Sequence, residues 1–118
     1  MRIDERKAGD VMIISVAGDI TMAKGGDLML KDKVRSLIEQ GYLKLVLDMG
    51  EVSYVDSAGL GQLVQAHAAA SSAGGVLKLS RVTKRLKDLL TITKLVTVFD
   101  SYDDEESALA SFGAAAKS

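Results

Sequence analysis

The segment Leu43–Met49, "LKLVLDM", is almost continuously apolar, with a single lysine inside it. Strands that are covered by protein on both faces have this composition, whereas strands with one wet face alternate polar and apolar residues. Doubly covered strands are typically central and parallel, and parallel neighbours need crossover connections that are usually helical. The segment therefore predicts an α/β fold with helices packed against a sheet.

Periodicity and turn residues place the other elements around this strand. We expect strands at 2–7, 11–18, 76–80 and 96–99, and a further short apolar stretch at 52–55. We expect helices over 30–38, 58–72, 84–90 and 101–112, with the first two strands forming an antiparallel hairpin. The chain is thus predicted to be one domain over residues 1–112, with a mixed, mostly parallel sheet of about five strands and four helices, followed by a flexible tail at 113–118.

Composition excludes several classes of function. The chain has 118 residues and no cysteine, which rules out disulfides and cysteine nucleophiles, and its single histidine, His67, argues against a histidine metal centre. The 15 basic and 16 acidic residues give a net charge of −1, so direct nucleic-acid binding is not expected. No apolar run approaches the ~20 residues of a membrane span, and no signal-type segment is present. We expect a soluble, cytoplasmic protein with no membrane span.

The segment "VDSAGLG", Val55–Gly61, lies between a strand and a helix, where binding sites of parallel sheets tend to lie. The simplest interpretation is that Ser57 caps the helix by accepting a hydrogen bond from the N–H of Gly59 or Leu60, worth about 1 kcal/mol. That interpretation leaves Gly59 and Gly61 unexplained, since each glycine costs a helix about 1 kcal/mol relative to alanine. The glycines suggest a surface that something must approach closely.

Two catalytic or nucleotide-binding alternatives fit poorly. A serine hydrolase elbow needs glycine where Val55 stands, and His67 belongs to the apolar helix face of Leu60, Leu63, Val64 and Ala68. A dinucleotide fingerprint would need glycine at Val64. Weak nucleotide binding at the helix N-terminus stays possible.

A third alternative is that Ser57 accepts a phosphate. A serine at a helix start, flanked by small residues, is open to another protein's active site. A phosphate there would add about −1.5 to −2 charges beside the N–H groups of the helix N-terminus, which would stabilise it. The same charge beside Asp56 would repel an acidic partner, so the modification would act as a switch.

The stretch "LVLDMGEVSYVDSAGLGQLV" resembles the anti-sigma-factor antagonists, which are built on the STAS domain. "GDIT" at 18–21 is similar to that family's loop after the second strand, and "VTKRLKDLLTITKLVTVFDSYDDEESAL" is similar to its closing segments. The resemblance covers nearly the whole chain. Two residues depart from the family pattern: Thr21 replaces a frequent Asp, and Lys94 replaces a Gly.

The resemblance implies a regulatory protein without catalysis or a cofactor of its own. Members bind an anti-sigma factor that is also a serine kinase, and this binding frees the sigma factor. The kinase then phosphorylates the antagonist and the complex dissociates. A serine phosphatase removes the phosphate and restores the binding form. Carried over here, Ser57 is the phosphate acceptor, and the docking surface comprises Asp19, Ile20, Thr21, Asp56, Ala58, Gly59, Leu60 and Gly61. Because Thr21 departs from the family pattern and has a hydroxyl, it is a candidate second, minor phosphate acceptor. The alternative is a non-switching STAS scaffold in a stress-signalling or lipid-transport complex, with Ser57 serving only as a cap.

Three further features receive structural interpretations. Asp48, at the end of the buried strand, is expected to accept hydrogen bonds from loop amides. His67 is expected to be a partly buried core residue. The basic cluster Arg81, Lys84, Arg85 and Lys87 is interpreted as a solvated helix face rather than a partner site.

Overall fold

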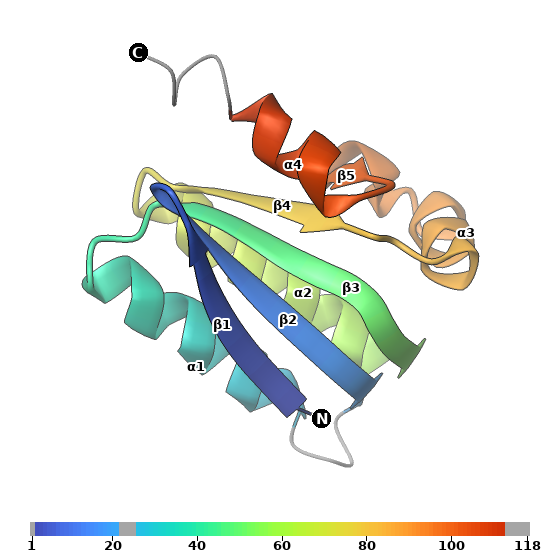
Figure 1. Ribbon diagram of the computed structural model, residues 1–118. Helices are drawn as coiled ribbons and strands as arrows, with labels where there is room; N and C mark the ends of the chain where they lie inside the picture. The colour runs from blue at the N-terminus through green and yellow to red at the C-terminus, as the bar shows by residue number, and fades with distance from the viewer. Residues whose placement is uncertain (1, 22–25, 113–118) are drawn as a thin grey trace.

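The computed structural model describes residues 2–21 and 26–112 and contains a five-stranded sheet with four α-helices in that part of the chain (Figure 1). In chain order the elements are β1 (Arg2–Ala8), β2 (Val11–Ile20), α1 (Gly26–Glu39), β3 (Lys44–Val55), α2 (Ser57–Ser72), β4 (Val76–Ser80), α3 (Lys84–Ile92), the 3₁₀ helix η2 (Leu95–Thr97), β5 (Asp100–Tyr102) and α4 (Glu105–Ser111). The predicted α/β class, with a mixed sheet of five strands and four helices, is confirmed.

The sheet order is β1-β2-β3-β4-β5, with β1 antiparallel to β2 and all other neighbours parallel. The predicted hairpin is therefore present, and β3 is the central strand. Residues 45–49 of β3 are all buried, as expected for a strand covered on both faces.

Helices α1, α2 and α3 pack on one face of the sheet and α4 covers the other (Figure 1). The larger core joins Met12, Ile14 and Leu47 of the sheet to Leu63 of α2. The smaller core lies under α4, where Phe112 and Ala108 contact Val11, Ile13 and Val46. An ion pair between Arg6 of β1 and Glu105 ties α4 to the sheet, and it raises the pKa of the Arg6 guanidinium.

The prediction of a strand at 96–99 is wrong. Residues Leu95–Thr97 form the 3₁₀ helix η2, and the last strand is β5 at Asp100–Tyr102. Lys94 takes a left-handed backbone conformation (φ 63°), so the chain turns sharply after α3 and only Phe99 of the apolar stretch is buried. Val96 and Val98 remain 42% and 39% exposed, which means that the apolar run does not lie in the sheet.

Two smaller details also differ from the prediction. The apolar stretch at 52–55 belongs to β3, which continues across Gly50 with irregular register against β2. The buried face of α2 is set by Ala66 and Ala70 together with Leu60 and Leu63, whereas Ala68 is exposed.

The expected tail at 113–118 lies outside the described residues. In the part of the chain that is described, no helix is long and apolar enough to cross a membrane.

Candidate functional site

The segment that contains Ser57 lies at the carboxyl end of the central strand, next to the end of β2. The parallel pairing of β2 and β3 sets Asp19 opposite Tyr54 and Ile20 opposite Val55. The N–H of Asp56 donates to the carbonyl oxygen of Ile20 over 3.4 Å, which joins the two strand ends just before α2 begins. The "GDIT" and "VDSAGLG" segments are therefore neighbours at one edge of the sheet, where parallel α/β folds place their binding sites.

Asp56, not Ser57, is the N-cap of α2. Its backbone is extended (φ −90°, ψ −179°) and its Oδ1 accepts a hydrogen bond from the N–H of Gly59 over 2.6 Å. Ser57 is already the first residue inside the helix. The predicted capping role of Ser57 is therefore wrong, because the side chain one residue earlier reaches the third helical N–H and satisfies it.

Ser57 itself is exposed. Among the described residues its hydroxyl has no hydrogen-bond partner, so the protein's own structure does not occupy that oxygen. No acidic residue lies in the first turn of α2. The site thus presents a free hydroxyl at an electropositive helix end, next to the Asp56 carboxylate.

The two glycines of the first turns have different causes. A Cβ on Gly59 would overlap the carbonyl oxygen of Ile20, so this glycine lets α2 begin directly against the end of β2. A Cβ on Gly61 would meet nothing within 4 Å, and Gly61 is exposed. The inference that both glycines serve an approaching partner was wrong for Gly59; only Gly61 lacks an internal explanation.

Burial also divides the expected docking residues. Ile20 and Leu60 are core residues at 0% and 5% exposure, and Gly59 is buried beneath the helix start. The side chains of Ile20 and Leu60 and the backbone of Gly59 lie beneath the surface of the site and cannot form its outer face, which corrects the prediction for these positions. The accessible part of the site is formed by exposed Ser57 and Gly61 and half-buried Asp19, Asp56 and Ala58.

Thr21 is also buried, at 9% exposure, and its Oγ1 is enclosed with no hydrogen-bond partner. A kinase cannot reach a hydroxyl that is enclosed in this way. This burial argues against Thr21 as a minor phosphate acceptor in the folded chain, and that role stays a prediction.

Asp48 lies earlier on β3, with its side chain 7% exposed. Its Oδ1 accepts from the N–H of Gly50 over 3.0 Å, an amide within β3 and not in a loop as predicted, and its Oδ2 accepts from Arg81 over 3.2 Å. Arg81 is thus no member of a free basic helix face, and Lys87 likewise pairs with Asp103 at 3.1 Å. Sequence reasoning missed the Arg81 pairing because the left-handed backbone at Arg81 (φ 53°), which precedes α3, cannot be anticipated from side-chain spacing.

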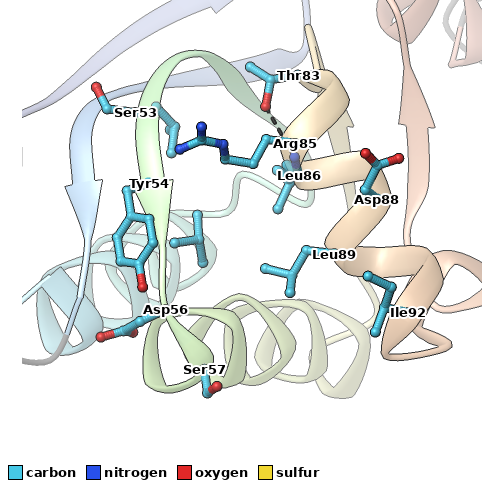
Figure 2. Close-up of a pocket in the computed structure, with 12 residues that line it drawn as sticks. Ser53, Tyr54, Asp56, Ser57, Thr83, Arg85, Leu86, Asp88, Leu89 and Ile92 are labelled. Carbon is cyan, nitrogen blue, oxygen red and sulfur yellow. Dashed lines mark hydrogen bonds between the residues drawn. The ribbon is translucent and has the colours of Figure 1, made fainter.

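Next to Ser57 is a pocket of about 340 Å³ between the end of β3 and α3. Figure 2 shows the residues from β3 on one side and those of α3 on the other, with Ser57 at one end. The wall is formed by Val52, Ser53, Tyr54, Val55, Asp56, Ser57, Thr83, Arg85, Leu86, Asp88, Leu89 and Ile92. No sequence signal identified this pocket, because its two sides come from segments about thirty residues apart.

His67 does not contribute to the site. It is half-buried on α2 and meets the ring of Phe99 edge to face, with 5.3 Å between the ring centroids. The predicted role as a partly buried core residue is confirmed.

Comparison with known proteins agrees with this geometry. A sequence profile of the STAS domain family matches residues 2–108. The anti-sigma-B factor antagonist of Bacillus subtilis (strain 168) is 32% identical over 100 residues, which is 85% of this chain and 89% of that protein.

Two solved structures share the fold at low identity. A sulfate transporter family protein from Wolinella succinogenes superposes with a TM-score of 0.80 at 23% identity, covering 92% of this chain and 89% of the other. The phosphorylated form of the Bacillus cell fate determinant SpoIIAA superposes with a TM-score of 0.70 at 15% identity, covering 92% and 97%. With the profile match and the B. subtilis relative, the fold leads to one conclusion: this chain belongs to the STAS domain family, among the anti-sigma-factor antagonists.

Proposed function

We propose that this protein is a cytoplasmic antagonist of an anti-sigma factor, without enzymatic activity of its own, and that phosphorylation of Ser57 controls it. Unphosphorylated, it binds an anti-sigma factor that is also a serine kinase, and the sigma factor is released. The kinase then phosphorylates Ser57, which ends the complex, and a serine phosphatase restores the binding form.

The exposed, unoccupied hydroxyl of Ser57 at the first residue of α2 is the observation that carries this proposal. Because Asp56 supplies the cap, Ser57 has no capping role to lose when it is modified. Exposed Gly61 lies one turn further along α2 and has no side chain that could block access to the Ser57 hydroxyl. Both features support access by a partner's active site.

The charge distribution supports a switch of the same kind. The first turn of α2 has no acidic residue, so the helix N-terminus can stabilise a phosphate on Ser57. That phosphate would add about −1.5 to −2 charges next to Asp56 at the centre of the proposed contact. Like charges placed against an acidic partner surface cost binding free energy, so the complex would dissociate without refolding.

Phosphate mapping tests the acceptor directly. The protein is incubated with its cognate kinase and ATP, and the modified residue is located by mass spectrometry. We expect phosphate on Ser57 and none on exposed Ser53 or buried Thr21. With a demonstrably active kinase, phosphate elsewhere or nowhere would contradict the proposal.

Binding measurements test the switch. We expect Ser57→Ala to bind the kinase like the parent and Ser57→Asp to bind at least about tenfold more weakly. Ser71→Asp, which adds the same charge at the exposed far end of α2, is the matched control and should bind like the parent. Equal affinity of Ser57→Asp and the parent would instead favour a non-switching STAS scaffold.

A further inference from the structure

The pocket between β3 and α3 is bordered by a strand edge that has no partner strand. Pairing between β3 and β4 ends at Asp48 opposite Ser80, yet β3 continues to Val55. Figure 1 shows β3 extending past the end of β4. Along Val52–Val55 the backbone groups on the β4 side therefore border the pocket with no strand paired to them in the described chain.

The middle of the pocket is apolar. Val55 comes from the strand, and Leu86, Leu89 and Ile92 come from successive turns of α3. Ile92 is 78% exposed and Tyr54 is 49% exposed, so apolar surface remains in contact with water around the opening. At about 340 Å³, the pocket is in the size range of sites that hold small organic molecules.

One end of the pocket carries a cation. In Figure 2 the Arg85 side chain extends from α3 toward β3 near Ser53, whereas the Asp88 carboxylate points to the other side of the helix. Within residues 2–21 and 26–112, Arg85 forms no ion pair, unlike Arg81 and Lys87 near it. A guanidinium that is not neutralised by the protein favours an anionic group at this end.

We propose that this pocket binds a small amphipathic carboxylate. The carboxylate would pair with Arg85 and accept from unpaired backbone N–H groups of β3, while an aliphatic chain lies along Leu86, Leu89 and Ile92. Ser57 lies at the other end of the pocket, so the aliphatic chain of the ligand would end near this residue. Binding itself does not depend on the proposed switch and can be tested without a kinase.

Titration of the full chain with sodium octanoate below its micelle concentration, followed by amide chemical shifts, tests the site. We expect saturable shifts confined to residues 52–57 and 83–92. Octylamine has the same chain with the opposite charge and should bind at least about tenfold more weakly. Butyrate, which has the carboxylate without most of the chain, should also bind more weakly.

Two variants on the exposed side of α3 test whether Arg85 pairs with the carboxylate of the ligand. We expect Arg85→Gln to weaken octanoate binding about tenfold and Lys84→Gln, an exposed neighbour outside the pocket, to leave it unchanged. Both residues are exposed, so neither change threatens the fold. Equal weakening by the two variants, equal binding of octylamine, or shifts spread over the whole surface would each overturn the proposal.

Discussion

Helices α2 and α4 both begin with an aspartate cap, but their first turns differ in charge. The carboxylate of Asp56 accepts from the N–H of Gly59, and that of Asp104 accepts from the N–H of Ser107, each over 2.6 Å. After its cap, α4 continues with Glu105 and Glu106, whereas α2 has no acidic residue in its first turn.

The difference shows what each helix start can accept. The acidic first turn of α4 already neutralises its helix end, and Glu105 is also held by Arg6. The start of α2 has the Asp56 cap but no acidic residue in its first turn, and it presents a neutral hydroxyl there. The start of α4 thus has a structural role, whereas the start of α2 is suited to accept a negatively charged group such as a phosphate.

Gly59→Ala should have the largest effect on stability. The added methyl would overlap the carbonyl of Ile20, which is backbone and cannot rotate away, so α2 must shift from the end of β2. We expect a loss of about 3 kcal/mol in the free energy of unfolding, measured by urea denaturation. A loss below about 1 kcal/mol would show that the contact between α2 and β2 is loose.

Asp56→Ala should come next, with a loss of about 1 kcal/mol, because the N–H of Gly59 loses its acceptor. Ser57→Ala is the matched control and should leave stability within about 0.5 kcal/mol of the parent, since the Ser57 hydroxyl caps nothing. Asp56→Asn keeps an acceptor and should lose little. If Ser57→Ala and Asp56→Ala cost the same, the assignment of the cap is wrong.

Gly61→Ala should raise the free energy of unfolding by about as much as Asp56→Ala lowers it. Its added methyl meets open space, so alanine's better helix propensity should raise the free energy of unfolding by about 1 kcal/mol. Under the proposed function the same methyl should weaken kinase binding, because it stands where the partner must approach. Gain of stability together with unchanged binding would remove the functional explanation of this glycine.

Much of this architecture can be predicted from sequence because it depends on local pattern. The apolar run at 43–49, the hairpin after Ala8 and the periodic helices all correspond to elements in the sheet and layers. Side-chain identity at the start of α2 identified the right segment but the wrong cap, because two adjacent residues could both accept the bond. Only the observed backbone at Asp56 decides between them.

The remaining differences are tertiary in origin. Gly59 is explained by a carbonyl on β2 nearly forty residues earlier, and Arg81 by a carboxylate on β3. The stretch 96–99 has strand-like residues but follows a left-handed turn at Lys94, which moves the strand to Asp100–Tyr102. These features depend on contacts between segments that are far apart in the sequence, so a local sequence pattern cannot predict them.

The smallest expected effect concerns the cap of α4 and its dependence on pH. Hydrogen bonding to the N–H of Ser107 holds the pKa of Asp104 below its ordinary value of 3.8. A carboxyl group whose pKa is lowered by folding stabilises the folded state above the unfolded pKa, and this contribution disappears as the pH falls through the folded pKa. We therefore expect Asp104→Ala to lower the melting temperature slightly at pH 7 and the difference from the parent to shrink toward pH 3.

Asp103 provides the control for this measurement, because it is the adjacent carboxylate but makes only an exposed pair with Lys87. Asp103→Ala should leave the melting temperature nearly unchanged, since an exposed pair contributes little. Asp104→Asn keeps an acceptor for the N–H of Ser107 and should be as stable as the parent at neutral pH. Unlike the parent, this variant should not lose the contribution of the cap in acid. If the difference between Asp104→Ala and the parent persisted unchanged at pH 3, the charge of the cap would be irrelevant. The difference in charge between the starts of α2 and α4 would then depend on the first-turn glutamates Glu105 and Glu106 and not on the charge of the caps.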